Sequence, residues 1–132
     1  MPIVESEFLL ALRADDRKHK AALAIFDTYP VPEGCSAAFL EIAWLLRSKG
    51  KNPTQVSLTL AILRAEPENR DVTEAPVTSS QIERANDSLS RHSMTFFHAL
   101  ILANAEESQD KQLVSNDSTF DSIGTVERIS LK

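Results

Sequence analysis

Apolar residues recur at helical spacing along most of the chain, and short apolar runs separate these stretches. The run at 2–4 predicts a first strand, and the spaced apolar residues that follow predict a helix over 5–13. A second helix is predicted from Asp15 or Asp16 to about Tyr29, since acids in its first turn suit the helix dipole. The two prolines and the glycine of YPVPEG then end the helical pattern.

The middle of the chain continues this alternation. A short strand is predicted near Gly34 and Cys35, and the run AAFLEIAWLLRSKG predicts a buried helix that ends at its last glycine. Asn52 is a good N-cap and Pro53 suits a first helical position, so the next helix is predicted from about Pro53 to Leu63. This helix is apolar on more than one side. It is therefore either fully buried or a candidate contact with a second copy of the chain.

The C-terminal half carries two more predicted helices and three more predicted strands. AEPENR predicts a turn, and DVTEAPV predicts a short strand over 71–77. Thr78 or Ser79, with Glu83 nearby, opens a helix to about Ser90. A buried helix follows over MTFFHALILANA. The segments KQLVSND and TVERISL then predict the last two strands.

Strands that alternate with helices predict an α/β fold. We expect a three-layer α/β/α arrangement with a short, mainly parallel sheet, formed by one domain over 1–132. The single cysteine, Cys35, excludes a disulfide within the chain. No apolar run approaches a membrane span, and the N-terminus lacks the positive charge of a secretory signal, so a cytoplasmic protein without a membrane anchor is predicted. The net charge of −5 means that any nucleic acid would have to be held locally.

Three acids follow predicted strands on the side where ligands of parallel α/β sheets bind. Glu5 comes directly after the first strand, Glu41 lies inside the helix after the second, and Asp117 ends the strand QLVS. Each also has an ordinary structural interpretation. Glu41 suits a salt bridge, Asp117 suits a helix cap, and Glu5 suits the first turn of a helix. Their common position favours a shared cation site.

Two further residues are candidates for the same site. His98 is the one ionisable residue within MTFFHALILANA, where it is either a core histidine bonded to a neighbour or part of a site. Asp121 follows Asp117 by four residues and either joins the site or lies in a solvated turn.

The segments ESEFLLAL, DDRKHKAA, FLEIAWLLRSKG, SRHSMTFFHALILANA and LVSNDSTFDSI, in this order, resemble a PIN domain of the small single-domain type found in VapC-like toxins. The resemblance implies a ribonuclease that uses Mg²⁺ or Mn²⁺ held by acids, a homodimer, and a small antitoxin protein as a partner. Glu41 and Asp117 match acids of the family. Glu5 stands where the family has an aspartate, His98 stands at another acidic position, and Asp121 matches a frequent additional acid.

The two departures from the family pattern leave two hypotheses open. Hard divalent cations prefer oxygen ligands, so Glu5 still suits the site, whereas His98 loses a negative charge and, if protonated, becomes a built-in cation. In the first hypothesis the protein is a metal-dependent ribonuclease in which Glu5, Glu41 and Asp117 hold the cation, assisted by Asp121 and His98. In the second it is an inactive or weak PIN domain that binds RNA or a protein without cutting.

Overall fold

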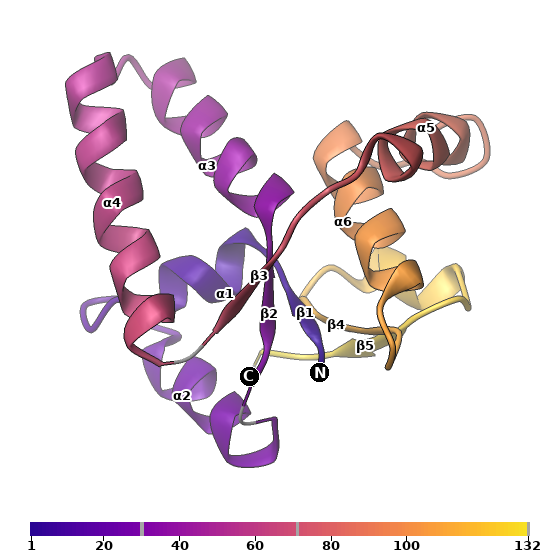
Figure 1. The fold of residues 1–132 in the computed structure, drawn as a ribbon, viewed down its shortest axis with the longest axis horizontal. Coiled ribbons are helices and arrows are strands. Elements are labelled where there is room, and N and C mark those ends of the chain that lie inside the picture. Colours follow the sequence, from indigo (N-terminus) through magenta and orange to yellow (C-terminus); the bar gives the residue numbers. More distant parts are fainter. Residues whose placement is uncertain (30, 71, 132) are drawn as a thin grey trace.

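Five parallel strands form the centre of the molecule. The computed structural model describes residues 1–29, 31–70 and 72–131 (Figure 1). The sheet order is β3-β2-β1-β4-β5, and every neighbouring pair is parallel. The strands are β1 (Ile3–Val4), β2 (Glu33–Cys35), β3 (Thr73–Ala75), β4 (Gln112–Val114) and β5 (Glu127–Ile129). The predicted α/β fold with a parallel sheet is confirmed.

Helices connect the strands and cover both faces of the sheet (Figure 1). One α-helical pair stands in each of the three longer connections, as parallel strands require a crossover. The helices are α1 (Ser6–Ala11), α2 (His19–Thr28), α3 (Ser36–Ser48), α4 (Pro53–Asn69), α5 (Ser79–Ser88) and α6 (Phe96–Glu107), with a 3₁₀ helix η1 (Ser118–Ser122) between β4 and β5.

Two hydrophobic cores lie on opposite faces of the sheet because successive strand residues point to opposite sides. Ile3 packs into the core formed with α5 and α6, whereas Val4 packs into the core formed with α1, α2 and Leu63 of α4. Helix α3 contributes to both, through Ala37 on one side and Ala38 on the other. Burial of both faces explains why the central strand β1 reads as a short apolar run, whereas the edge strands β3 and β5 are partly exposed and carry charged residues.

Helix α4 is longer than predicted. It continues through AEPE to Asn69, so the turn predicted at AEPENR is wrong. Pro67 lies inside the helix and is buried, and its carbonyl accepts from Arg70 N at 3.0 Å and from Val72 N at 2.9 Å. A proline this close to the end of a helix removes one backbone hydrogen bond. Packing of its ring and the two bonds to its carbonyl compensate for that loss.

Several other boundaries differ from the predictions. Helix α2 begins at His19, because the Asp16 carboxylate accepts from Lys18 N at 2.8 Å and holds a turn there. Thr78 caps α5 in a capping box closed by Gln81 rather than Glu83. The predicted strand over 71–77 is shorter, and its first residue lies outside the described residues. The strand predicted to end at Asp117 already ends at Val114.

Candidate active site

The candidate acids gather at the carboxyl edge of the sheet, beside the two central strands. β1 lies between β2 and β4, and the strand order reverses at β1 and β4. The register aligns Val4 with both Gly34 and Val114. Glu5 therefore leaves the sheet at the point where parallel α/β folds bind ligands. Asp117 follows β4 by three residues, and Glu41 lies in α3, which starts directly after β2.

Glu5 is the most perturbed acid of this group. It stands at the N-cap position of α1 and is only 5% exposed, while its Oε1 accepts from Ser115 Oγ at 2.8 Å. Burial raises the pKa of the Glu5 carboxyl from 4.5 to about 7. The Ser115 hydrogen bond opposes this shift, and the negative charges of Glu7, Glu41 and Asp117 add to it. Ionised Glu5 is thus costly unless a cation lies beside it.

Glu41 is half-buried on α3, and its Oε1 accepts from Ser6 Oγ, the residue next to Glu5. None of the described cations forms an ion pair with it. The salt-bridge interpretation of this acid therefore finds no partner within the described chain. The Ser6 contact instead ties Glu41 to the first residue of α1.

Asp117 combines a structural contact with a place in the acidic group. Its Oδ1 accepts from Thr119 N at 3.0 Å, so it caps η1, as its structural interpretation predicted. Its Oδ2 lies 3.2 Å from His98 Nδ1. The Thr119 hydrogen bonds lower the pKa of Asp117, and the charges of His98 and Arg128 contribute in the same direction. Asp117 is therefore an anion held in a fixed orientation at the edge of the site.

His98 lies in the first turn of α6 and reaches the acidic group through Asp117. Its backbone N–H donates to the Thr95 hydroxyl at 3.2 Å, and its ring centroid lies 5.6 Å from that of Phe120. The side chain is 25% exposed. The imidazole is therefore neither a fully buried core residue nor a solvated one. It stands against the carboxylate that the resemblance placed in the same site.

Asp121 is engaged elsewhere. Both of its oxygens accept from Arg128, at 2.8 Å from Nε and 2.9 Å from Nη2. The same guanidinium donates from Nη1 to Ser115 O at 3.2 Å. The aspartate is half-exposed, and the Arg128 bonds lower its pKa. Asp121 thus acts through Arg128 on the strand end rather than by contact with the other acids.

The chemistry of these side chains suits a hard divalent cation, although their spacing is loose. Carboxylate oxygens are the ligands that Mg²⁺ and Mn²⁺ prefer. The raised pKa of Glu5 is the cost that a bound cation would remove. Across the described residues, however, no three His, Cys, Asp or Glu side chains are close enough to form a metal site. The types of side chain therefore fit such an ion. Their positions in this structure do not form a closed coordination sphere.

Sequence reasoning missed the hydroxyl residues that orient the acids. Ser6 and Ser115 each follow a strand closely and donate to Glu41 and Glu5 respectively. Their position within two residues of the ends of β1 and β4 was the available signal, because residues after parallel strands meet at one edge. Arg128 was also missed. Its partner, Asp121, lies in a different element, and periodicity does not show such a pair.

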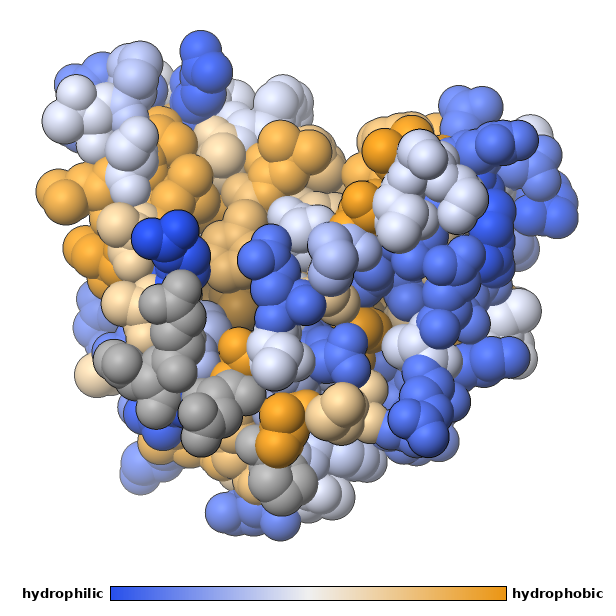
Figure 2. All heavy atoms as spheres, viewed as in Figure 1, coloured by the Kyte–Doolittle hydropathy of each residue, from blue (hydrophilic) through white to orange (hydrophobic). Residues whose placement is uncertain are grey.

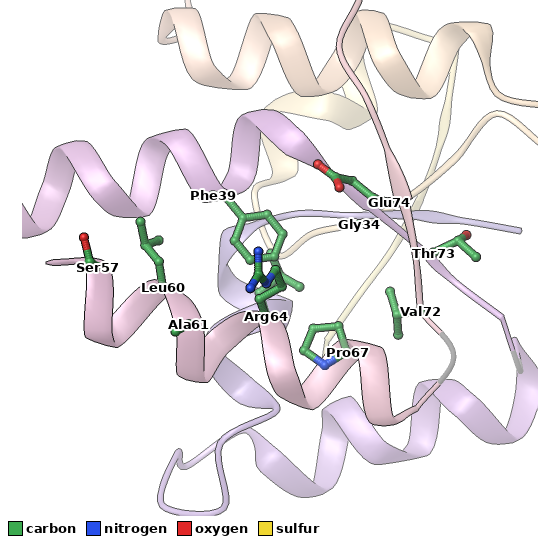
Figure 3. A pocket seen from close by; sticks show the side chains of 11 residues that line it. Gly34, Phe39, Ser57, Leu60, Ala61, Arg64, Pro67, Val72, Thr73 and Glu74 are labelled. Carbon is green, nitrogen blue, oxygen red and sulfur yellow. The ribbon is translucent and has the colours of Figure 1, made fainter.

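A separate cavity of about 580 Å³ lies on the other side of α3, between α4 and the edge strand β3 (Figure 3). Phe39, Leu60 and Val72 give it apolar walls, and Arg64 and Glu74 stand at its border. None of the candidate acids lines it. No helix in the described part of the chain is both long and apolar enough to cross a bilayer.

Solved structures share this fold over nearly the whole chain. VapC20 of Mycobacterium tuberculosis, described as a Sarcin-Ricin loop cleaving toxin, is 23% identical, with a TM-score of 0.70, and the match covers 96% of this chain and 98% of that one. A toxin-antitoxin complex from Klebsiella pneumoniae matches at 16% identity and a TM-score of 0.67, covering 100% and 98%.

VapBC2 of Rickettsia felis, solved with a DNA fragment from its promoter, matches at 13% identity and a TM-score of 0.67, covering 97% of this chain and 96% of that one. No protein-family model and no curated protein sequence matches the chain. At these identities the likeness concerns the fold. The chain has the PIN-like fold of VapC toxins, as its sequence resemblance predicted.

Proposed function

We propose that this protein is a metal-dependent ribonuclease of the PIN type whose acidic site differs from the family pattern. The raised pKa of buried Glu5 beside two further acids, Glu41 and Asp117, supports the proposal most strongly. Acids that are buried and grouped in this way are costly to ionise, and a divalent cation with its bound water would lower that cost. The VapC20 toxin with the same fold is described as cleaving the Sarcin-Ricin loop, which supports RNA as the substrate class.

Glu5, Glu41 and Asp117 would hold Mg²⁺ or Mn²⁺, which when bound supplies a water of lowered pKa and positive charge beside the phosphoryl oxygens. The protein's own contribution is orientation. Ser115 fixes one oxygen of Glu5, Ser6 fixes one oxygen of Glu41, and Thr119 N fixes one oxygen of Asp117. Each carboxylate keeps its second oxygen for other interactions. For Asp117 that oxygen faces His98.

The contact between His98 and Asp117 favours a second candidate function. An imidazolium 3.2 Å from Asp117 Oδ2 would compete with a metal ion for the same oxygen. Together with the loose spacing of the acids among the described residues, this supports a PIN-like domain that binds RNA or a protein and cuts weakly or not at all. The two functions share one site and differ in whether a cation binds there.

RNA cleavage with added Mn²⁺ or Mg²⁺ tests the choice between them. We expect the wild-type protein to cut, Asp117→Asn to abolish cutting, and His98→Asp to increase the rate by restoring a fourth acid. Glu83→Gln, an exposed acid on α5, is the matched control and should cut like wild type. If wild type is inert with both metals while His98→Asp cuts, the nuclease proposal fails for the natural protein and the second candidate function, without cutting, stands. Cutting that survives Asp117→Asn would place the reaction elsewhere.

A homodimer is part of the proposal, and α4 supplies the candidate contact. Leu58 and Ile62 are 64% and 55% exposed on this helix, whereas Val56 and Leu63 are buried against the protein. Helix α4 thus has the two apolar sides that its sequence indicated. Sedimentation should show a dimer for wild type and a monomer for the double variant Leu58→Asp/Ile62→Asp. A monomeric wild type at high concentration would remove this part of the proposal.

A small antitoxin protein is the second proposed partner. Two of the similar structures are toxin complexes, one a toxin-antitoxin complex and one VapBC2. The 580 Å³ cavity between α4 and β3 offers this chain an apolar groove for a partner segment (Figure 3). Ala61→Arg would fill the groove with charge. It should weaken binding of a purified antitoxin without changing RNA cleavage by the free protein. The cytoplasmic location expected from the sequence stays a prediction.

A further inference from the structure

A large aromatic side chain stands beside the acidic site without being buried. Trp44 lies one turn after Glu41 on α3, a rise of roughly 4.5 Å along the helix axis. Its side chain is 58% exposed, and its ring lies 6.0 Å from that of Phe97, the residue before His98. Trp44 therefore borders the acidic group on α3, and Phe97 borders it on α6. Exposure of the only tryptophan in the chain calls for a reason.

The same helix leads from the acidic site to a cluster of positive charge. Arg47, Lys49 and Lys51 follow Trp44 at the end of α3 and the start of the turn into α4, and all three are exposed. None of them forms an ion pair with a residue that the structure describes. No acid lies between Arg47 and Lys51. We call these three residues the α3 basic tip.

The position of the α3 basic tip matters because the whole protein is acidic. A chain with a net charge of −5 repels RNA unless cations are gathered near the place where the strand lies. In Figure 1 the turn between α3 and α4 projects to one side of the molecule, away from α1 and α2. Figure 2 shows hydrophilic residues at the same place, above a mainly hydrophobic α3–α4 surface. One acid, Glu41, then an aromatic ring and then cations thus follow one another along α3 and the turn after it.

We infer that Trp44 is a stacking platform for a base of single-stranded RNA, and that the α3 basic tip binds the phosphates on the same side of the strand. Bases of single strands stack on exposed aromatic rings, and nearby cations hold the backbone. The inference rests on the proposed function, because the acids next to Trp44 are where the strand would be cut. A base paired within a duplex cannot reach the ring. This surface therefore selects unpaired segments.

The tryptophan itself provides the assay, since it is the only one in the chain. The wild-type protein is titrated in EDTA with a fluorescein-labelled single-stranded RNA of about 12 nucleotides, within the range that such binding sites cover. Binding is followed by fluorescence anisotropy, and stacking is followed by quenching of Trp44 in a parallel titration with unlabelled RNA. An abasic oligonucleotide of equal length should bind without quenching. A duplex of the same sequence should neither quench Trp44 nor bind as tightly.

Variants separate the ring from the charges. Trp44→Ala should weaken binding by roughly 5- to 150-fold, and Trp44→Phe should recover part of the loss. The triple variant Arg47→Ala/Lys49→Ala/Lys51→Ala should lower the slope of log affinity against log salt by about 2 for a single strand. Its control, Arg13→Ala/Arg17→Ala/Lys20→Ala, changes the net charge equally on the exposed α1–α2 region and should leave the slope unchanged. Ile82→Ala, on α5, is the control for loss of an exposed apolar side chain.

The results also distinguish this inference from the proposed function. Binding in EDTA does not depend on cleavage. If wild type cuts RNA but Trp44 is not quenched and Trp44→Ala binds equally well, the platform is refuted and the nuclease stands. If quenching occurs in a protein that never cuts, the nuclease fails and the platform stands. A fluorescence change with protein concentration alone, together with a sedimentation shift that Trp44→Ala abolishes, would show that a second copy covers this surface and overturn the inference.

Discussion

Substitution Glu5→Gln should stabilise the folded protein above neutral pH. The side chain is buried, and its Oε1 accepts from Ser115 Oγ at 2.8 Å. Glutamine keeps a carbonyl oxygen for this bond and has almost the same shape. The substitution therefore removes the ionisable proton and the negative charge while leaving packing nearly intact. Any change in stability then reports the cost of ionising this carboxyl inside the protein.

The magnitude follows from the pKa. Burial raises the pKa of Glu5 from 4.5 to about 7, so the folded protein binds this proton more tightly than the unfolded chain does. The proton on Glu5 therefore stabilises the folded protein fully below pH 4.5, and this stabilisation is lost as the pH rises through about 7. Each tenfold change in proton affinity is worth about 1.4 kcal/mol, which makes the loss about 3 kcal/mol. That is a large share of the 5–15 kcal/mol that is typical of small proteins.

Urea denaturation followed by circular dichroism at pH 4.5, 6, 7 and 8, in buffers with EDTA, measures this effect. The free energy of unfolding of Glu5→Gln should match that of wild type at the lowest pH and exceed it by about 3 kcal/mol at the highest. Glu83→Gln is the control, since it makes the same chemical change at an exposed position on α5. It should follow wild type throughout.

Parallel curves for wild type and Glu5→Gln would refute the reasoning, because they would mean that Glu5 ionises in the folded protein as easily as in the unfolded chain. Burial of this carboxyl would then carry no cost for its ionised form. A variant that is less stable at every pH would instead show that the carboxylate is already compensated. Repeating the high-pH measurement with Mn²⁺ adds a second criterion. The metal should stabilise wild type more than Glu5→Gln, since only the former supplies a charged ligand.

Three further changes test other parts of the structure. Phe8→Ala removes a fully buried ring that packs 5.8 Å from the ring of Phe26, and should lower the free energy of unfolding in urea by about 3–5 kcal/mol. Thr78→Ala removes the capping box of α5 and should cost about 1 kcal/mol in the same assay, with Ser79→Ala as a nearly neutral control. His98→Asp should raise the affinity for Mn²⁺ in calorimetric titration; unchanged affinity would show that residue 98 lies outside the cation site.

The fold was predictable because its signals are local. The prolines of YPVPEG mark the break in sequence between the first helices and β2, and an apolar run marks the buried central strand β1. Pro67 shows where local signals fail. The proline normally ends a helix, but here its ring is buried and its carbonyl accepts two backbone bonds. Only the packed structure supplies the energy that outweighs the propensity.

The candidate site was predictable to a lesser extent. Strand ends of a parallel sheet meet at one edge, so Glu5, Glu41 and Asp117 could be placed near one another before their contacts were known. Which oxygen faces which donor was not predictable. The contact between His98 and Asp117 depends on where α6 packs against the sheet, and the bond from Ser115 to Glu5 spans 110 positions of sequence. Such pairs follow from tertiary packing alone.

The charges of the site and of the α3 basic tip bear on each other. Glu5, Glu41 and Asp117 repel an RNA phosphate as long as no cation lies among them. Burial is the main reason that the pKa of Glu5 is raised, and the charges of Glu41 and Asp117 add to the shift. His98 neutralises this charge only in part, and only when protonated. A single-stranded RNA can therefore approach the acids only if other groups of the protein bind it. Trp44 and Arg47 lie on the helix that carries Glu41, and Lys49 and Lys51 follow directly after it, so these four residues can hold the RNA before a metal ion binds among the acids. RNA binding in EDTA should consequently depend on Trp44 and the α3 basic tip much more than on the acids.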